Sequence, residues 1–383
     1  MYLERLATEL MLYPMGHEPL PTLHGRSGGY ELRYSVRGAP FYVWKKPVPR
    51  ISDKILDCVV YLYPSVEHAQ MGEKWGGSGF LVGIPSEAHE NWNYIYCVTC
   101  KHVVQPMGSP VIRLNTEAGS NDIIELTPDN WVYHRDGDDL AACSIAFKNP
   151  DYFKYSMIHP SMFITEEYIE QQSIGAGDDV YMVGRLVNYQ GQQQNTPVVR
   201  FGNISMGQPQ PIRNEWGLLQ ESFLIETRSL SGLSGSPVFV YITPFSPTPA
   251  EYGERQPSTR LLGVDWGHMR SFEPVLKRHD DPGENKLVPV DQEWKVPSNS
   301  GQAQVVPAWK LQELLDQEEL KMARRQEDEQ IARWKSESSA AFDAQPADQS
   351  EEDSPFNRDD FFRDLRKAAR KRERPSQSDQ EKH

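Results

Sequence analysis

Short apolar runs follow one another along the middle of the chain, from Ile51 to about Trp309. They are rich in Val, Ile, Tyr and Phe, alternate with clusters of Gly, Pro, Asn and Asp, and include ILDCVVYLY, GSGFLVGI, YIYCVTC, DVYMVG and SPVFVYI. Runs of this length and composition predict β-strands. Many closely spaced strands favour all-β barrels or sandwiches over the alternating strands and helices of a parallel sheet. The sequence has no internal repeat of fixed period.

The hydrophobic period changes after Pro307. Apolar residues then recur at the spacing of one helix face, at Trp309, Leu311, Leu314, Leu315 and Leu320. We expect a helix that packs on the β body and continues as a charged stretch to about Lys335. Residues 336–356 contain too few apolar side chains to order themselves, and 358–374 could form a second short helix. The sequence therefore predicts a C-terminal helix and a charged, partly disordered tail.

Composition limits the class of protein. The length of 383 residues allows two core-bearing units with further segments. No run approaches the ~18 apolar residues of a membrane-spanning helix, and Glu4 and Glu9 interrupt the region where a secretion signal would be apolar. The four cysteines are too few for a disulfide framework. We expect a soluble, cytoplasmic protein that has no membrane partner.

The charge distribution disfavours nucleic acid as a partner. The chain carries 40 Lys+Arg against 54 Asp+Glu, a net charge of −14. Residues 321–383 are nearly neutral, so the acidity belongs to the body of the protein, which would repel a polyanion. The basic run at 366–374 is the one cluster that could bind phosphate groups, and a solvated charged helix explains it more simply.

The glycine-rich segment GLSGSP, from Gly232 to Pro237, precedes the strand-like residues VFV. Small residues allow the backbone to curl so that two N–H groups converge on a developing oxyanion while the hydroxyl of Ser234 stays exposed. An ordinary turn before a strand explains the same residues without chemistry. The G-x-S-x-G elbow of α/β-hydrolases fits less well, because Ser236 stands at its second glycine and a strand follows.

Two further residues could complete a catalytic triad with Ser234. His102 lies near the end of the strand-like run YIYCVTCKHVV, and Asp139 opens the apolar run DLAAC after an acidic turn. A nucleophilic serine needs a base, and the base needs a group that orients it. A histidine or a turn aspartate alone is more often structural. The chain order His102, Asp139, Ser234 is that of chymotrypsin-type enzymes.

From about Ile51 to Leu320 the chain resembles the chymotrypsin-like (trypsin-like) serine peptidases, especially their bacterial Deg-type branch. The matching segments are GSGFLVG, TCKHVV, DLA, GDDVYMVG and GLSGSP. The resemblance implies two antiparallel β-barrels of the chymotrypsin type and a serine endopeptidase that hydrolyses polypeptides through an acyl-enzyme. His102 would be the general base, Asp139 its orienting partner and Ser234 the nucleophile. The N–H groups of Gly232 and Ser234 would form the oxyanion hole, and no cofactor is implied.

The resemblance also suggests substrate-binding residues. Asp265, Trp266 and Gly267 match the family segment that lines the specificity pocket and pairs with the substrate backbone. Arg228 falls at the base of that pocket, which argues against a preference for basic side chains. Leu233 stands where enzymes activated by proteolysis carry an aspartate, so we do not expect zymogen-style activation.

The expected domain organisation has four parts. An N-terminal arm covers 1–44, a first barrel with the histidine and the aspartate covers 45–155, a second barrel with the serine and the C-terminal helix covers 156–320, and the charged tail covers 321–383. No peptide-binding PDZ domain is expected after the helix, because the remaining residues are highly polar. The arm or the tail could contact a protein partner.

Other interpretations of the same motifs are weaker. Cys97 and Cys100 form a C-x-x-C, but no second ligand pair follows at the spacing of a zinc site, so they are better explained as buried strand cysteines. Asp136, Asp138 and Asp139 begin like a calcium loop, yet its remaining ligand positions are missing. No metal is expected. The alternative function is a catalytically weak or inactive trypsin-like module that binds peptides as a scaffold or effector component.

Overall fold

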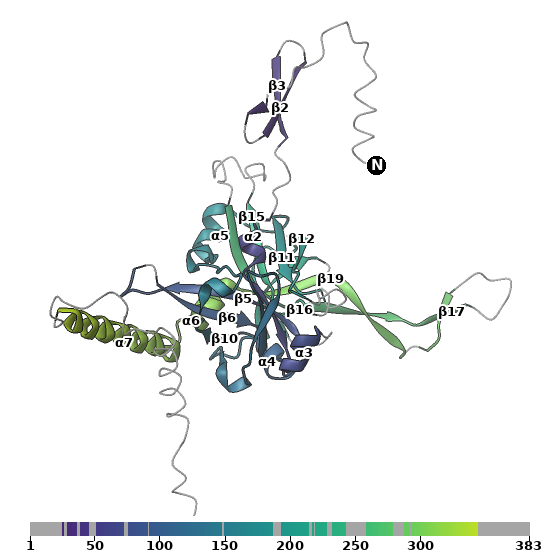
Figure 1. Cartoon of the computed structure of the whole chain (residues 1–383). Coiled ribbons are helices and arrows are strands. Elements are labelled where there is room, and N and C mark those ends of the chain that lie inside the picture. Colours follow the sequence, from purple (N-terminus) through teal and green to yellow (C-terminus); the bar gives the residue numbers. More distant parts are fainter. Residues whose placement is uncertain are drawn as a thin grey trace, which may run out of the picture. The chain divides into compact units, whose positions relative to one another are not determined.

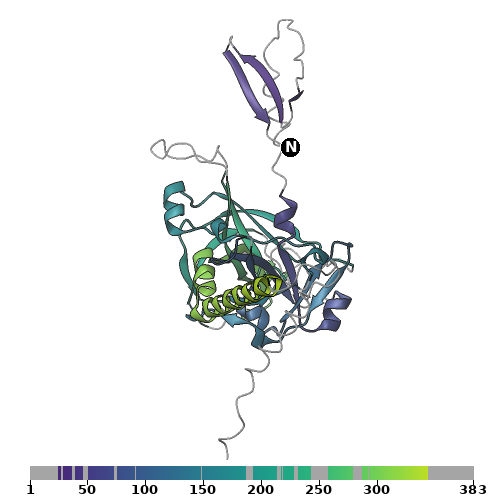
Figure 2. The same cartoon turned by 60° about the vertical axis from the view of Figure 1, so that its left-hand side comes forward.

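The structure is a computed structural model of the chain (Figure 1 and Figure 2). It describes the backbone of 25–26, 29–36 and 39–45, and residues 51–72, 76–90, 92–147, 149–186, 193–213, 217, 219–227, 232–242, 258–278, 287–291 and 293–343. The chain divides into two units, Met1–Ser52 and Asp53–His383. Among the described helices, none combines the length and the apolar character that crossing a membrane requires.

The N-terminal unit contains a small antiparallel sheet. Its strands are β1 (Gly25–Arg26), β2 (Gly29–Val36) and β3 (Ala39–Lys45), in the order β1-β2-β3. Tyr34 lies opposite Phe41 in the register of β2 and β3. The sheet falls within the segment expected to form an N-terminal arm.

A seven-stranded antiparallel sheet forms the first half of the larger unit. Its strands are β4 (Val59–Tyr63), β5 (Gly77–Pro85), β6 (Asn93–Thr99), β7 (Val111–Asn115), β8 (Asn121–Ile124), β9 (Val132–Tyr133) and β10 (Ala141–Ile145). Their order is β8-β7-β4-β5-β6-β10-β9. β4 is buried along its whole length, which explains its unbroken apolar sequence.

A second seven-stranded sheet forms the other half. Its strands are β11 (Asp179–Gly184), β12 (Val198–Ile204), β13 (Gln210–Arg213), β14 (Leu219–Glu226), β15 (Pro237–Ile242), β16 (Ser258–Pro274) and β19 (Lys295–Pro307). The order is β12-β11-β15-β16-β19-β14-β13, and β12 also pairs with β14. That additional pairing closes six of the strands into a barrel.

These two sheets have the arrangement of the chymotrypsin-like two-barrel fold, so the fold class predicted from the sequence is confirmed. Among the described strands, the second sheet closes by pairing, whereas β8 and β9 remain the edges of the first. Beyond the barrel, β16 and β19 continue as a two-stranded ribbon toward β17 (Leu276–Arg278) and β18 (Leu287–Pro289), as Figure 1 shows.

Two buried arginines lie between the sheets. Arg113 belongs to β7 and Arg185 follows β11, and both are fully buried. Their guanidinium carbons lie 5.0 Å and 4.2 Å from the ring centroid of Tyr63. Arg185 Nη1 also donates a hydrogen bond of 3.1 Å to the carbonyl oxygen of Leu62. Burial lowers the pKa of both guanidinium groups, although the ordinary arginine pKa is high enough to keep them charged.

Most helices are short. They are α2 (Asp53–Leu56), α3 (Val66–Met71), α4 (Lys101–Val104), α5 (Glu166–Gln172), α6 (Ala308–Leu315) and α7 (Glu318–Asp343). Three single 3₁₀ turns lie at Pro128–Asn130, Pro150–Tyr152 and Pro160–Met162. α6 buries the apolar face predicted from the sequence, including Leu311, Leu314 and Leu315.

The C-terminal helix differs from the prediction in two ways. It is interrupted at Asp316 and Gln317, and its second part continues to Asp343, although 336–343 were expected to be disordered. Residues 336–343 include alanines and a glutamate, which are good helix formers, and extending an existing helix costs far less than starting one. The rest of the predicted tail lies outside the described residues.

Candidate active site

His102 and Asp139 are brought together by strand pairing. His102 lies in α4, directly after β6, and Asp139 lies just before β10. In the antiparallel register of these strands Ala141 is opposite Thr99, so the residues that follow β6 face those that precede β10. The sequence pattern of each strand therefore determines where the two side chains meet.

Both carboxylate oxygens of Asp139 contact His102. The backbone N–H of His102 donates to Oδ1 over 2.9 Å, and Nδ1 lies 2.6 Å from Oδ2. The side chains are nearly enclosed, with 12% of His102 and 5% of Asp139 exposed. A carboxylate only accepts hydrogen bonds, so Nδ1 carries the proton and Nε2 presents its lone pair. The two contacts fix the orientation of the imidazole relative to Asp139.

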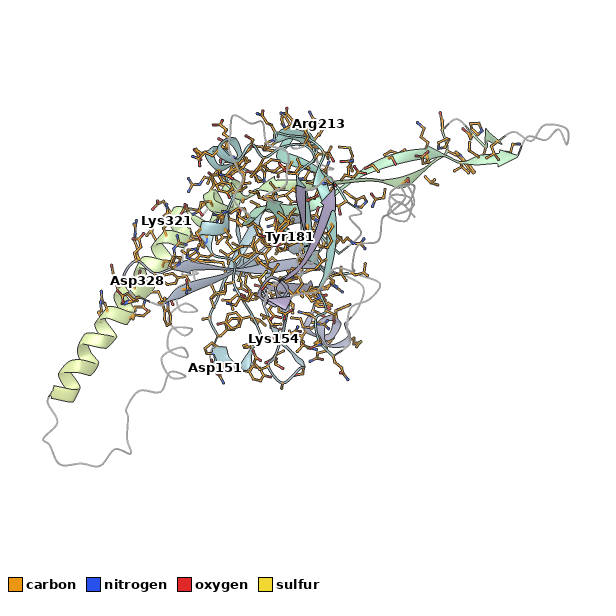
Figure 3. The ribbon with its side chains drawn as sticks, turned by 90° about the horizontal axis from the view of Figure 1, so that it is seen from above. Asp151, Lys154, Tyr181, Arg213, Lys321 and Asp328 are labelled. Carbon is orange, nitrogen blue, oxygen red and sulfur yellow. The ribbon has the colours of Figure 1, made fainter. Side chains whose placement is uncertain are left out.

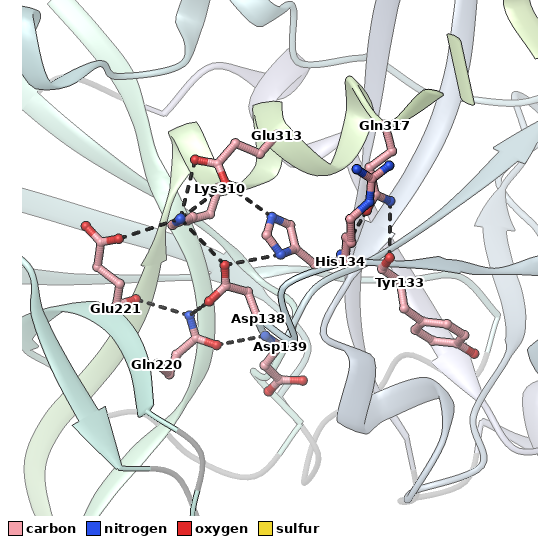
Figure 4. Close-up of polar contacts among 10 residues, drawn as sticks. Tyr133, His134, Asp138, Asp139, Gln220, Glu221, Lys310, Glu313 and Gln317 are labelled. Carbon is pink, nitrogen blue, oxygen red and sulfur yellow. Dashed lines mark hydrogen bonds and ion pairs between the residues drawn. The ribbon is translucent and has the colours of Figure 1, made fainter. Parts of the chain in front are cut away.

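Gln220 holds the segment that carries Asp139. Its Oε1 accepts a 2.7 Å hydrogen bond from the Asp139 backbone N–H, and its Nε2 donates a 2.9 Å bond to Oδ1 of Asp138 (Figure 4). Gln220 belongs to β14 of the second sheet and is buried. No sequence motif marks this residue, because its partners lie far away along the chain.

Ser234 lies in the loop before β15, and the loop is bonded to β5. The backbone N–H of Ser78 donates to the carbonyl oxygen of Ser234 over 2.9 Å, and the Ser78 hydroxyl donates to that of Gly232 over 2.8 Å. Gly232 and Gly235 have φ angles of 94° and 87°, which favour glycine. The small residues of the predicted motif are therefore required by the backbone.

The serine loop and the histidine helix meet at one end of β5. The carbonyl oxygen of Asp265 accepts a 2.7 Å bond from the Gly235 N–H and a 3.2 Å bond from Cys100 Sγ. A Cβ atom on Gly77 would lie 2.7 Å from Val103 Cγ1 and 3.1 Å from the carbonyl oxygen of Ser234. Gly235 and Cys100 thus share the Asp265 carbonyl oxygen, and Val103 and Ser234 both lie beside Gly77.

The two predicted oxyanion donors have no acceptor among the described residues. Neither the Gly232 nor the Ser234 backbone N–H donates a hydrogen bond within that part of the chain.

The predicted substrate-binding residues lie along β16. Asp265 is fully buried, and Trp266 is nearly so, with its Nε1–H donating to the Ser222 hydroxyl over 2.9 Å. The register with β19 shifts between Asp265 and Gly267, a bulge that turns the backbone beside the serine loop. Gly267 is partly exposed. Arg228 lies outside the described residues.

Among the described residues, two groups of side chains have the spacing of metal ligands. In the first, Cys100 lies beside His102 and Asp139. Burial raises the pKa of the Cys100 thiol well above its usual range, and the nearby carboxylates raise it further, so the sulfur keeps its proton and is a poor ligand. Its hydrogen bond to the Asp265 carbonyl is the better description of its role.

The second group consists of His134, Asp138 and Glu313. The ammonium group of Lys310 lies 3.1 Å from Glu313 Oε2 and 3.9 Å from Asp138 Oδ2. A cation of the chain therefore already pairs with these carboxylates, and we describe the group as an ion-pair cluster.

No protein-family model matches the chain, and no curated protein matches its sequence. Solved structures that match include the Rv3671c protease of M. tuberculosis in its active form (15% identity, TM-score 0.37, covering 69% of this chain and 81% of that one). Others are the HtrA-type protease AlgW with a decapeptide (16%, TM-score 0.33, 69% and 66%) and HBP (9%, TM-score 0.36, 70% and 93%). The matching structures therefore include an HtrA-type protease.

These TM-scores are low, so the fold assignment rests on the strand order and the barrel closure described above. By those features the chain has a trypsin-like protease fold.

Proposed function

We propose that the protein is a serine endopeptidase that uses Ser234 as nucleophile, His102 as general base and Asp139 as the residue that orients His102. The observation that carries the proposal is the double contact of the Asp139 carboxylate with the backbone and the imidazole of His102. The position of Ser234 in a loop bonded to β5, next to the histidine helix, supports it.

The reaction follows from this arrangement. Nε2 of His102 accepts the hydroxyl proton as Ser234 Oγ attacks the peptide carbonyl, and Asp139 stabilises the imidazolium that forms. The N–H groups of Gly232 and Ser234 donate to the tetrahedral oxyanion. His102 then protonates the leaving amine, and water hydrolyses the acyl-enzyme with His102 again as base. Loss of one oxyanion donor typically costs about 10²–10³ in kcat.

The substrate in this proposal is an extended polypeptide. Gly267 and the bulge before it lie on β16, directly beyond the carbonyl that accepts from the serine loop. A peptide that added as a strand along this backbone would bring its scissile carbonyl to Ser234. Main-chain pairing would bind many sequences, and side-chain pockets would select among them.

An active-site fluorophosphonate probe tests the nucleophile. We expect the folded wild-type protein to react, the Ser234→Ala variant not to react, and His102→Ala to react several orders of magnitude more slowly. Ser236→Ala is a matched control, because Ser236 lies in the same loop but its buried hydroxyl has no hydrogen-bond partner within the described residues.

Two results would contradict the proposal. Equal labelling of the wild type and Ser234→Ala would exclude Ser234 as the nucleophile. A folded wild-type protein that reacts with neither the probe nor a peptide library would exclude the peptidase and leave the inactive peptide-binding module as the explanation of the fold.

A further inference from the structure

A polar network, buried at His134, Asp138 and Gln220, surrounds the turn that leads to Asp139. Figure 4 shows its members arriving from three elements: the turn itself, β14 and α6. The network contains His134, Asp138, Gln220, Lys310 and Glu313. Part of it orders the turn, and part of it joins the turn to the C-terminal helix.

Gln220 uses both ends of its amide on consecutive residues. Oε1 accepts from the backbone N–H of Asp139, and Nε2 donates to the side chain of Asp138. With Gln220 only 1% exposed, water has little access to replace either bond. The amide therefore determines the direction in which the Asp139 backbone enters β10.

The ion-pair cluster holds the other side of Asp138. Its Oδ2 lies 3.2 Å from Nδ1 of His134 and 3.9 Å from Nζ of Lys310, while Nε2 of His134 lies 3.5 Å from Oε2 of Glu313. Burial lowers the pKa of Lys310, but its hydrogen bond to Glu313 and the surrounding carboxylates outweigh that effect and raise it. Asp138 thus has one oxygen bonded to Gln220 and the other beside two basic groups.

We propose that Gln220 is a positioning residue of the candidate active site, which orients Asp139 against His102 by bonding both Asp138 and the Asp139 N–H to the second sheet. The inference rests on the proposed function and extends it to a residue that touches neither the substrate nor His102. In this proposal, the geometry of the His102–Asp139 pair beside the first sheet depends on β14 of the second sheet.

The physical reason lies in the two oxygens of Asp139. One accepts from the backbone of His102 and the other lies 2.6 Å from its Nδ1, so a small rotation of the residue weakens both contacts. Without Gln220, the buried Asp139 N–H and one Asp138 oxygen lose their partners, and the turn must move to find others. Misplacement of a catalytic group by about 1 Å can cost roughly 10²-fold in rate.

The first test compares Gln220→Leu with Gln317→Leu. Gln317 is a matched control because it also uses both ends of its amide on this turn, accepting from the Arg135 N–H over 2.8 Å and donating to the Tyr133 carbonyl over 3.1 Å. It does not contact Asp138 or Asp139. We expect the probe-labelling rate and kcat to fall about 10- to 100-fold in Gln220→Leu with KM little changed. Gln317→Leu should keep the wild-type rate.

A double-mutant cycle separates positioning from general destabilisation. If Gln220 acts through Asp139, then Gln220→Leu added to Asp139→Asn should lower the rate little further, because the residue that it positions is already lost. An undiminished fall in that background would overturn the proposal. So would a folded Gln220→Leu variant with the rate of the wild type.

A spectroscopic measurement does not require turnover. The Nδ1 proton of His102 resonates far downfield when it lies in a short hydrogen bond to a carboxylate, and it can be observed in Ser234→Ala protein. We expect Gln220→Leu to shift or broaden this resonance and Gln317→Leu to leave it unchanged. An unchanged resonance in Gln220→Leu would refute the positioning role even if the protein proved to be a peptidase. A changed resonance in a protein that never reacts with the probe would refute the proposed function alone.

Discussion

Gly235 is the residue of the serine loop with the least freedom to change. It has a φ angle of 87°, and a Cβ atom would lie 2.0 Å from the carbonyl oxygen of Ser78 and 2.3 Å from Thr99 Oγ1. Thr99 Oγ1 is itself bonded to the Ser78 carbonyl. Any side chain at Gly235 therefore separates the serine loop from β5.

We expect Gly235→Ala to destabilise the protein by several kcal/mol and to abolish probe labelling. Gly119→Ala is the control, since Gly119 has a φ angle of 79° but nothing lies within 4 Å of its Cβ position. That variant should lose only about 1 kcal/mol from its backbone conformation. Urea unfolding measures both, and equal losses would show that the contact with Ser78 is unimportant.

The candidate triad could be predicted from the sequence, because each member lies in a local motif and the three motifs occur in a known order. Gln220 could not be predicted in this way. It occupies an ordinary position in a strand, and only the folded chain brings its amide to Asp138. Ser78 is intermediate, because it lies in the recognised segment GSGFLVG but its bonds to the serine loop have no local signature.

α7 is joined to the first sheet by polar contacts of Asp328 and Arg324. Asp328 accepts a 2.8 Å bond from the Ser86 hydroxyl and a short one from the hydroxyl of Tyr94 on β6. Arg324, one turn earlier, donates to the Tyr96 hydroxyl over 3.1 Å. Figure 3 shows Lys321 and Asp328 along this helix. Because α7 is rich in charged residues and has no broad apolar face, these polar contacts hold it against the first sheet.

Tyr94→Phe should loosen this helix without affecting the barrels. The change removes the Tyr94 donor and leaves a partly buried carboxylate with fewer partners, a cost of about 1–3 kcal/mol. Hydrogen exchange should become faster in the described part of α7 and stay unchanged in β4 and β15. Tyr152→Phe, at an exposed tyrosine, is the control. Uniformly faster exchange across both sheets would contradict this account.

At the level of elements, the short apolar strands and the apolar face of α6 were predictable because burial imposes a regular pattern. The break at Asp316 and Gln317 was not, since the charged residues on both sides are equally compatible with one continuous helix. Nor was the full length of β16 predictable, because its outer half, GHMRSFEP, lacks the regular alternation of polar and apolar residues that marks a strand. Exposed Phe272 lies in this ribbon, and exposed Trp294 directly precedes its second strand.

The four cysteines bear on the stability of the whole molecule. All are free and buried, and burial raises the thiol pKa of each, to about 12 for Cys143 and well above the usual range for Cys97 and Cys100. Burial likewise raises the pKa of Cys58 and brings that of Tyr181 to about 12. In the unfolded chain these groups ionise near their ordinary values, 9.0 for a thiol and 10.0 for a tyrosine.

Stability should therefore fall at alkaline pH. The pKa values of these groups are higher in the folded than in the unfolded protein. Their contribution to the free energy of unfolding is therefore complete below the unfolded-state pKa, and it is lost as the pH rises toward the folded-state pKa. Each thiol should lower the free energy of unfolding by about 1.4 kcal/mol for every pH unit above its unfolded-state pKa. Urea midpoints between about pH 8 and pH 10 measure the slope. Cys143→Ala should reduce it, and a midpoint independent of pH would contradict the prediction.

The carbonyl oxygen that accepts from both Gly235 and Cys100 has a consequence for synthesis of the protein. That oxygen belongs to Asp265, which follows every proposed reacting residue in the chain, and its strand β16 pairs with the still later β19. A nascent chain that already contains His102, Asp139 and Ser234 but not β16 still lacks the two bonds that tie Gly235 and Cys100 to one oxygen. In the proposed peptidase, hydrolysis would therefore begin only after β19 has been synthesised, so that a shorter nascent chain could not digest its neighbours.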